Sequence, residues 1–420
     1  MKIAILGSGG REHALANQIK KSKKTDKIYC IPGNAGTGAI GENININLDD
    51  FNGIYNFVNE RQIDLVVVGP EKPLVEGISD FLKEKKIKVF GPSKKASQFE
   101  GSKTFTKNIC KQYGIPTAKF EILKNLEQSI EYLKKVEFPI VIKADGLAAG
   151  KGVYICKDMR NASEAVEEIF NGKFGKAEKI VIEEFLEGEE MSFFIISDGK
   201  TFRKFNTAQD HKRVGVGDTG KNTGGMGAYT PSGLINQELE NKIINKIINP
   251  TLKALNDINE EYIGFLYAGL MIKDNEPYLI EYNVRMGDPE CQTILPLLKS
   301  DFLEIILACC DRKLDEIDIQ WSDKKSLCVV LCSKGYPDTY EKNIEISGLD
   351  KLNLEHDSFI FHAGTTIKND KTIVNGGRVL NFVSISDNYL TSRNTIIDKI
   401  EKLNWSGGFY RSDIGFKIIK

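Results

Sequence analysis

The sequence contains no long hydrophobic run. Its longest apolar stretches, such as residues 65–68 and 305–310, have the length of a single strand or a short buried helix, whereas a membrane-spanning helix needs about 18 or more apolar residues. The first residues, MKIAILGSGGREH, reach a glycine turn after one short apolar stretch, which is not the pattern of a signal peptide. We therefore expect no membrane segment and a cytoplasmic location.

Cysteine and histidine are too few and too scattered for a disulfide framework or a structural metal site. The chain has 8 cysteines without a CxxC pair, and 4 histidines that do not cluster with them. Scattered cysteines in a chain of this length are typical of reduced thiols that pack as small apolar side chains. Reduced thiols agree with a cytoplasmic location.

An excess of charge of either sign is also absent. Lysine and arginine number 57 against 58 aspartate and glutamate residues, so the net charge is −1. A general nucleic-acid-binding protein normally has a basic excess, and we therefore expect small-molecule partners and neither nucleic acid nor membrane. A chain of 420 residues with 41% hydrophobic residues is long enough for about two to four globular domains.

Short apolar runs, glycine turns and helical segments alternate along residues 1–90. The runs at 2–6, 28–31 and 64–68 each end at a turn rich in glycine, asparagine or proline. This alternation predicts a parallel sheet covered by helices, with ligands bound at the carboxyl ends of its strands.

Two further parts follow. Residues 119–187 have the pattern of a small α/β module, and short strands with β-turns begin near residue 325. We therefore expect domains at 1–101, 102–324 and 325–420, and a multidomain fold that combines α/β and α+β architecture. A long irregular loop is expected at 210–229, a single helix at 239–256 and a hairpin turn at 375–378.

The first glycine turn, GSGGRE at 7–12, lies between a predicted strand and a predicted helix. Backbone N–H groups in such a place can bind phosphate. A dinucleotide-binding fingerprint would need glycine where Glu12 stands, so that motif fails. From this turn alone, phosphate binding and a plain tight turn are equally acceptable interpretations.

A second glycine-rich loop, at 143–153, is more specific. Lys143 ends one predicted strand, and Gly150-Lys151-Gly152 leads into the next. Glycines let the backbone approach phosphate oxygens closely, and lysines supply charge. The pattern favours a flap over a nucleotide, against a surface hairpin with solvated lysines.

Two strand ends carry polar residues in a suggestive order. Glu281 and Asn283 alternate along one predicted strand and so share a face, and two oxygen ligands are a minimal Mg²⁺ site. Arg285 continues the alternation, where it could meet a developing anion. The segment 181–190 could pair with adenine and ribose, although taken alone it is better interpreted as a solvated turn.

These elements together resemble the ATP-grasp superfamily and, over essentially the full length, the phosphoribosylamine–glycine ligase family. Met286 departs from the family pattern, which usually has an aromatic residue there. The resemblance implies an N-terminal α/β domain, an ATP-grasp domain with a mobile lid at about 119–187, and a small β-rich C-terminal domain. The blocks that carry it are GSGGREHA (7–14), PGNAGT (32–37), VGPEKPLV (68–75), EGSKTFTK (100–107), VIKADGLAAGKGV (141–153), VIEEFLEGEE (181–190), QDHKR (209–213), DTGKNTGGMGAY (218–229), FLYAGLM (265–271), EYNVRMGDPE (281–290), FHAGT (361–365) and NGGRVL (375–380).

The resemblance also implies a reaction and its residues. The family joins glycine to 5-phosphoribosylamine with ATP, through glycyl phosphate, giving glycinamide ribonucleotide, ADP and phosphate in purine biosynthesis. Arg285, Lys143 and Lys151 would act in catalysis, and Glu281 and Asn283 would hold Mg²⁺ or Mn²⁺. The nucleotide would contact Lys103, Lys143, Gly150, Lys151, Gly152, Glu183 and Glu190. Phosphoribosylamine would contact Gly9, Gly10, Arg11, Glu12, Asn34, Gly36, Thr37, Pro70, Glu71, Asp210, Lys212 and Arg213.

Three rival interpretations are less favoured. Another ATP-grasp ligase, one that uses bicarbonate or formate, would share the nucleotide chemistry. A nucleotide-binding dehydrogenase is disfavoured by Glu12, and a non-catalytic regulator by the presence of the lysines, Glu281, Asn283 and Arg285. We expect a monomer or a weak homodimer.

Overall fold

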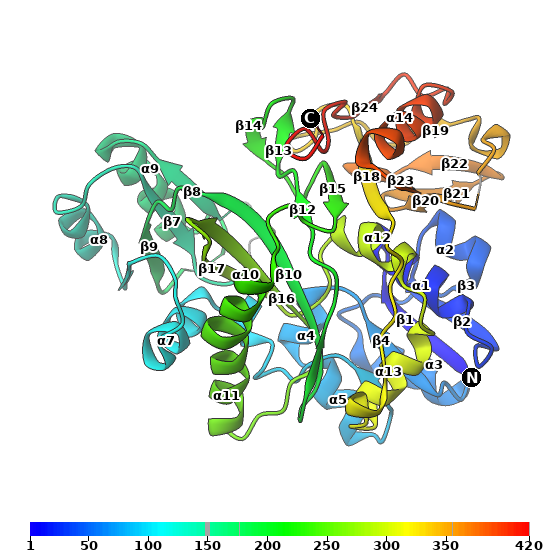
Figure 1. The fold of residues 1–420 in the computed structure, drawn as a ribbon, viewed down its shortest axis with the longest axis horizontal. Helices are drawn as coiled ribbons and strands as arrows, with labels where there is room; N and C mark the ends of the chain where they lie inside the picture. The colour runs from blue at the N-terminus through cyan, green and yellow to red at the C-terminus, as the bar shows by residue number, and fades with distance from the viewer. Residues whose placement is uncertain (148–151, 176, 355, 420) are drawn as a thin grey trace.

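The N-terminal part is a five-stranded parallel sheet of order β3-β2-β1-β4-β5 with helices packed on it (Figure 1). The computed structural model describes residues 1–147, 152–175, 177–354 and 356–419. The inner strands are buried because helices cover both faces of the sheet, which explains their continuous apolar runs. The strands are β1 (Lys2–Gly7), β2 (Lys27–Pro32), β3 (Glu42–Asn43), β4 (Leu65–Val68) and β5 (Val89–Phe90), and the helices are α1 (Gly10–Lys20), α2 (Ala35–Ile40), α3 (Phe51–Glu60), α4 (Glu71–Glu76) and α5 (Ile78–Glu84).

The carboxyl ends of β2, β1 and β4 meet at one edge of this sheet. The chain moves from β1 outward to β2 and β3, and then returns to the other side of β1 with β4 and β5. Parallel sheets bind ligands where the strand order reverses in this way. The turns that lead into α1, α2 and α4 all lie at that edge, so the three predicted substrate segments are brought together.

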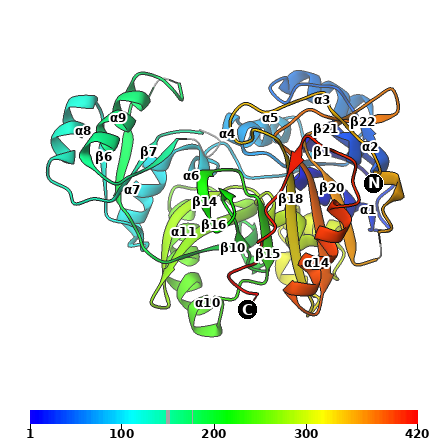
Figure 2. The same ribbon diagram turned by 90° about the horizontal axis from the view of Figure 1, so that it is seen from above.

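A separate lobe holds residues 120–184. Its antiparallel sheet, of order β6-β9-β7-β8, has its own core with Ile142, Val166 and Ile169. In helix α9, the buried residues Ala162, Ala165, Val166 and Ile169 recur with helical spacing and face that sheet. The lobe projects from the rest of the molecule (Figure 2). Its elements are β6 (Phe120–Leu123), α8 (Leu126–Leu133), β7 (Ile140–Ala144), β8 (Val153–Cys156), α9 (Met159–Phe170) and β9 (Ile180–Glu184).

A four-stranded antiparallel sheet of order β11-β10-β16-β17 forms the centre of the molecule. The predicted single helix at 239–256 is wrong in detail, because a π-helical segment interrupts it. Pro250 lacks the N–H that would continue the regular ladder, and this loss accompanies the interruption. The elements are α6 (Gln98–Gly101), α7 (Lys103–Tyr113), β10 (Glu189–Asp198), β11 (Phe202–Lys204), α10 (Gln237–Ile243), η1 (Ile244–Ile248), α11 (Asn249–Asp257), β16 (Ile263–Lys273) and β17 (Glu276–Asn283).

The C-terminal sheet recruits strands from far upstream. Strand β15 pairs with β18, and β12 pairs with β15, so the expected irregular loop at 210–229 is wrong: the segment forms strands, including the hairpin β13–β14. Pairing with a distant strand leaves no local periodicity, so the sequence pattern does not reveal these strands. The elements are β12 (Gln209–Asp210), β13 (Arg213–Gly215), β14 (Thr219–Asn222), β15 (Gly227–Thr230), β18 (Lys325–Ser333), β20 (Ser358–His362), β23 (Arg378–Ser386), α14 (Tyr389–Ile400) and β24 (Gly408–Phe409).

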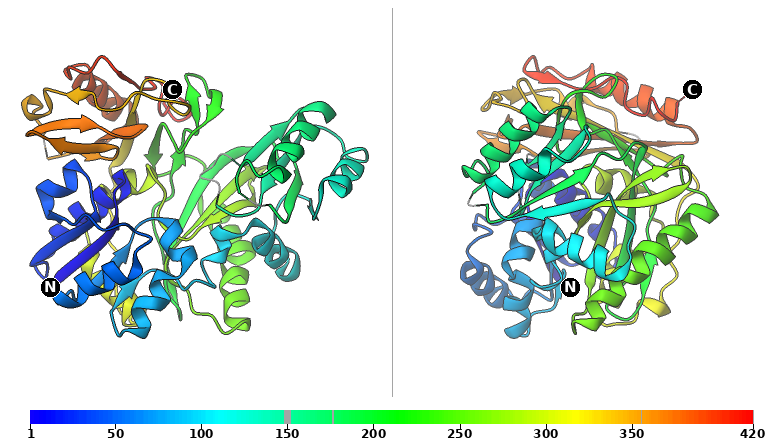
Figure 3. Two further views of the ribbon diagram at one scale, coloured as in Figure 1. Left: turned by 180° about the vertical axis from the view of Figure 1, so that it is seen from behind. Right: turned by 90° about the vertical axis from the view of Figure 1, so that its left-hand side faces the viewer.

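The expected hairpin turn at 375–378 is also wrong. Strand β22 belongs to a small sheet of order β19-β22-β21, whereas β23 pairs with β18 and β20, so residues 375–377 cross between two sheets. Seen from behind, the C-terminal sheets lie above the N-terminal domain, and the lobe of residues 120–184 stands apart from both (Figure 3). The remaining elements are α12 (Glu290–Ile294), η2 (Leu295–Leu297), α13 (Phe302–Cys310), η3 (Leu314–Glu316), β19 (Glu345–Ile346), η4 (Leu349–Lys351), β21 (Thr365–Lys368) and β22 (Lys371–Val374).

The cysteines agree with the expectation of reduced thiols. All eight are unpaired, and seven of them are buried. In the described part of the chain, no helix is both long and apolar enough to cross a membrane.

Candidate active site

Two lysines and one glutamate form a buried charge cluster where the lobe meets the central sheet. The ammonium groups of Lys143, on β7, and Lys107, on α7, lie 2.9 and 3.1 Å from the two carboxylate oxygens of Glu183, on β9. Burial alone would raise the pKa of Glu183, but the two lysines outweigh it and lower that pKa. Lys143 also donates to the backbone oxygen of Ile280 at 3.2 Å, which ties the lobe to β17. The Glu183 carboxylate is therefore engaged with the lysines, and its contact with a nucleotide stays a prediction.

The start of the glycine-rich loop is fixed over the N-terminus of α7. Lys103 donates to the backbone oxygen of Gly146 at 2.8 Å. The Asp145 carboxylate accepts from the backbone N–H of Thr104 at 3.2 Å and from its hydroxyl at 2.8 Å. Gly146 has a φ of +97°, a conformation that favours glycine. The loop thus leaves β7 in a direction that α7 sets.

The far side of the same loop returns at Gly152. Its backbone oxygen accepts from the Ala144 N–H at 2.8 Å, which closes the base of the β7–β8 hairpin. Gly150 and Lys151, two further predicted nucleotide contacts, lie outside the described residues.

Glu281 and Asn283 lie at the end of β17 and alternate along it, as predicted. Gly269 faces Glu281 across the strand pair, where a β-carbon would lie 3.2 Å from the Glu281 Cγ. Burial would raise the pKa of Glu281, but the surrounding cations lower it, so the carboxylate is held ionised. An ionised carboxylate beside an amide oxygen is a donor set that fits a hard divalent cation. The cations around Glu281 are Lys212, Lys143, Lys103 and Arg285.

A second charge cluster lies where β12 passes β10. Lys212 pairs with Glu190 at 2.5 Å. Burial raises the pKa of Asp210 to about 7; Lys212 opposes that rise, and the neighbouring carboxylates add to it. Arg213 points elsewhere: its guanidinium donates to the backbone oxygen of Gly220 within the β13–β14 hairpin. The structure therefore groups Asp210 with Lys212 and separates Arg213 from them.

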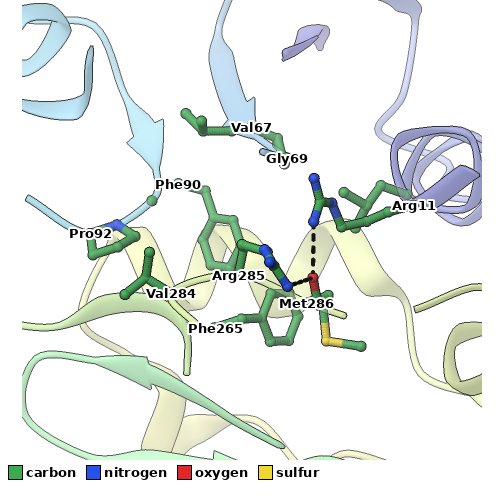
Figure 4. A pocket seen from close by; sticks show the side chains of 12 residues that line it. Arg11, Val67, Gly69, Phe90, Pro92, Phe265, Val284, Arg285 and Met286 are labelled. Atoms are coloured by element: carbon green, nitrogen blue, oxygen red, sulfur yellow. Dashed lines mark hydrogen bonds between the residues drawn. The ribbon is translucent and has the colours of Figure 1, made fainter. Parts of the chain in front are cut away.

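Arg285 follows β17 and sits between two carboxylates. Its Nη2 lies 2.7 Å from a Glu100 oxygen and its Nε 3.2 Å from a Glu71 oxygen. The backbone oxygen of Met286 accepts from both Arg285 and Arg11, at 3.3 and 3.2 Å (Figure 4). The two arginines thus lie on one small hollow, lined by Arg11, Leu15, Val67, Val68, Gly69, Phe90, Gly91, Pro92, Phe265, Val284, Arg285 and Met286.

The first glycine turn is closed by its own glutamate. Glu12 accepts from the Gly9 N–H at 2.6 Å and pairs with the Arg11 Nε at 2.6 Å. A β-carbon at Gly69 would lie 2.2 Å from a Glu12 oxygen, so the glycine makes room for the carboxylate. The Arg11 N–H faces an Asp288 oxygen at 3.4 Å. The carboxylates of Glu12 and Asp288 thus already accept hydrogen bonds from backbone N–H groups of this turn. Its contact with substrate stays a prediction.

The second turn is held against the C-terminal domain. The Asn34 side chain accepts from the Gly36 and Thr37 N–H groups and donates to the backbone oxygen of His362 at 2.8 Å. Thr37 is fully buried, and a β-carbon at Gly36 would lie 2.1 Å from the His13 ring. These residues shape the turn and join two domains; a direct contact with substrate stays a prediction for them.

Gly10 and Pro70, two more predicted substrate contacts, occupy helix starts. Gly10 is the first residue of α1, packed so tightly that a β-carbon would lie 2.3 Å from the Asn381 side chain. Pro70 precedes α4 and places Glu71 in its first turn, toward Arg285.

Five charged residues of this region had no predicted role. Glu100 binds Arg285, and Lys107 binds Glu183. Asp288 pairs with Arg378 of the C-terminal domain at 3.4 Å, and Glu290 accepts from the Ser192 hydroxyl. Each lies in a block quoted for the resemblance, so the blocks contained them, but only packing shows which partner each one meets.

Comparison with known proteins identifies the family of this chain. Three family profiles, all named for phosphoribosylglycinamide synthetase, match its N domain at residues 1–100, its ATP-grasp (A) domain at 101–291 and its C domain at 326–417. The phosphoribosylamine–glycine ligase of Brucella melitensis is 45% identical over 421 residues, covering 100% of this chain and 99% of that protein. The chain belongs to the phosphoribosylamine–glycine ligase family. The predicted resemblance is confirmed.

Solved structures agree with this membership. The phosphoribosylamine–glycine ligase of Thermotoga maritima is 35% identical, with a TM-score of 0.86 over 99% of this chain and 100% of that chain. The predicted fold class is confirmed. A biotin carboxylase from Campylobacter jejuni matches with a TM-score of 0.75 at 14% identity over 98% of this chain and 93% of that chain, and that likeness shows the fold alone. ATP-grasp enzymes in general use ATP and divalent cations, which suits the ionised Glu281 and the lysines around it.

Proposed function

We propose that this ligase joins glycine to 5-phosphoribosylamine with ATP, through glycyl phosphate, and releases glycinamide ribonucleotide, ADP and phosphate. The observation that carries the proposal is the position of Glu281. Its ionised carboxylate lies among three lysines and Arg285, at the meeting point of the lobe, the central sheet and the N-terminal edge. A site of that kind can neutralise a polyphosphate and the phosphoryl group that leaves it.

The residues divide the chemistry between them. Lys103 and Lys143 would hold the nucleotide's phosphates, with Lys151 and Gly150 on the same loop. Glu281 and Asn283 would hold Mg²⁺ or Mn²⁺, which when bound neutralises phosphate oxygens. Arg285 would stabilise the negative charge of glycyl phosphate and of the transition states on either side of it. No strong base is needed, because a neutral amine attacks an acyl phosphate directly.

We propose that 5-phosphoribosylamine binds at the turns after β1, β2 and β4, at the edge of the N-terminal sheet where these strands end. Arg11 and Arg285 both line the hollow near this edge, and we propose that they meet the anionic group of the substrate there. Asp210 and Lys212 would approach the reacting centre from the other side of Glu281. The lobe of residues 120–184 would close over the nucleotide and exclude water from the acyl phosphate. We further propose a cytoplasmic enzyme that is a monomer or weak homodimer.

The test is a substrate dependence. ADP release should require glycine and 5-phosphoribosylamine together, and Glu281→Gln should reduce it by about 100-fold or more with little change in Tm. The control Glu240→Gln removes a carboxylate of α10 that pairs with Lys204 of β11, and it should leave the rate unchanged. Equal turnover with bicarbonate or formate in place of glycine would refute the assignment.

A further inference from the structure

Glu100 is a buried carboxylate to which the reaction as described gives no task. It lies in the short helix α6, and its side chain is 9% exposed. One oxygen accepts from the Arg285 Nη2 at 2.7 Å, and the other accepts from the backbone N–H of Val284 at 2.8 Å. The Glu100 carboxylate thus binds the main-chain N–H of Val284 and the guanidinium of the next residue, Arg285.

The second carboxylate near Arg285 is held differently. Glu71 lies 3.2 Å from the Arg285 Nε, and its side chain is 29% exposed, at the start of α4. Arg285 also lines the hollow, whereas Glu71 is not among its lining residues. On the Glu100 side the contact is shorter, more buried and backed by the main chain. The two carboxylates are therefore unequal: Glu100 holds Arg285 by the shorter and more buried contact.

The geometry points to Glu100 as the positioning residue for Arg285, which it orients toward the reacting acyl phosphate by fixing the guanidinium relative to the end of β17. This inference rests on the proposed role of Arg285. A guanidinium presents five N–H groups in a rigid plane, so fixing one edge against Glu100 sets the direction of the others. Val284 directly follows Asn283, so the same carboxylate also sets Arg285 relative to the proposed cation site.

Glu100 lies close in the chain to a proposed nucleotide contact. Lys103 follows it by three residues, at the start of α7, and donates to the glycine-rich loop. One short segment, 100–103, therefore carries both a nucleotide-binding lysine and the partner of Arg285. Misplacement of Arg285 by a fraction of an ångström should slow the chemical step more than it weakens binding.

The test is a double-mutant cycle on kcat with E100Q, R285Q and the double variant. E100Q removes the negative charge and presents a donor where an acceptor is needed. We expect kcat to fall by about 10- to 100-fold, with the KM for ATP and for glycine within about 2-fold of the original. In the R285Q background the same substitution should change kcat by less than about 2-fold. E100D, which keeps the carboxylate but shortens its reach, should recover part of the loss.

Each outcome decides between separate claims. If R285Q lowers kcat but E100Q does not, the positioning role of Glu100 is wrong and the role of Arg285 stands. If E100Q costs the same factor in both backgrounds, Glu100 does not act through Arg285. If R285Q keeps the original kcat, the proposed role of Arg285 fails and the inference fails with it. Should either Gln variant unfold, E100D and R285K form the same cycle; equal kcat losses for E100D in both backgrounds would overturn the inference.

Discussion

The buried histidine His13 offers a quantitative test of how the N-terminal and C-terminal domains are joined. Its Nδ1 accepts from the backbone N–H of His362 at 2.8 Å. A ring nitrogen that accepts a hydrogen bond cannot carry a proton, and protonation would break this contact. Burial lowers the pKa of His13 from 6.5 to about 3, and the neighbouring His362 adds to the effect. Acid should therefore weaken the folded state at this position.

The direction and size of the effect of pH on the free energy of unfolding follow from proton linkage at His13. Because the pKa is lower in the folded chain, the unfolded chain binds the extra proton between pH 6.5 and the folded value, so stability falls as pH falls through that window. The loss from this one group between pH 7 and pH 5 is about 2 kcal/mol. Glu100 and Asp210 act in the opposite sense, since burial raises the pKa of each to about 7. The pH dependence of the total free energy of unfolding therefore does not isolate His13. The difference in that free energy between the original chain and a His13 variant does.

The perturbation is His13→Asn, because the Asn Oδ1 can accept the same backbone N–H but does not titrate. Urea unfolding of both chains at pH 7 and pH 5 should show the destabilisation by H13N shrinking by about 2 kcal/mol at the lower pH. His356 is exposed, and H356N should show no such change. A gap between the original chain and H13N that is the same at both pH values would refute the reasoning.

Three further substitutions test packing that the structure assigns. Glu183→Gln leaves two buried lysines facing each other and should lower the free energy of unfolding by about 3 kcal/mol, measured with urea; an unchanged midpoint would contradict the buried cluster. Arg411→Met leaves the Asp413 carboxylate without its ion-pair partner and leaves Asp218 with Lys417 alone, and should lower Tm by several degrees at neutral pH; the loss should shrink as acid neutralises those carboxylates, and a pH-independent loss would argue against ion pairing. Gly69→Ala should raise the KM for phosphoribosylamine by about 10-fold, because its methyl group would displace Glu12 and with it the substrate turn; an unchanged KM would place the substrate elsewhere.

The sequence by itself determined the local elements and the family. Apolar runs followed by glycine turns predicted the strands and helix starts of the N-terminal sheet, because a buried parallel strand needs continuous apolar residues and a turn needs glycine. Glu281 and Asn283 could be placed on one face of a strand for the same kind of reason, since side chains alternate along a strand with a period of two. The blocks of the glycine-rich loops and strand ends were enough to predict the family.

Only the tertiary structure decided which charges meet. Glu183, a predicted nucleotide contact, pairs with two lysines, and the guanidinium of Arg213, a predicted substrate contact, donates to a backbone oxygen in the β13–β14 hairpin. Strands β12 and β15 join a sheet whose other members lie a hundred residues or so further along, which no local pattern can show. The physical reason is the same throughout: backbone geometry and burial repeat with short periods along the chain, whereas an ion pair or a sheet edge depends on segments that the sequence keeps apart and the fold brings within a few ångströms.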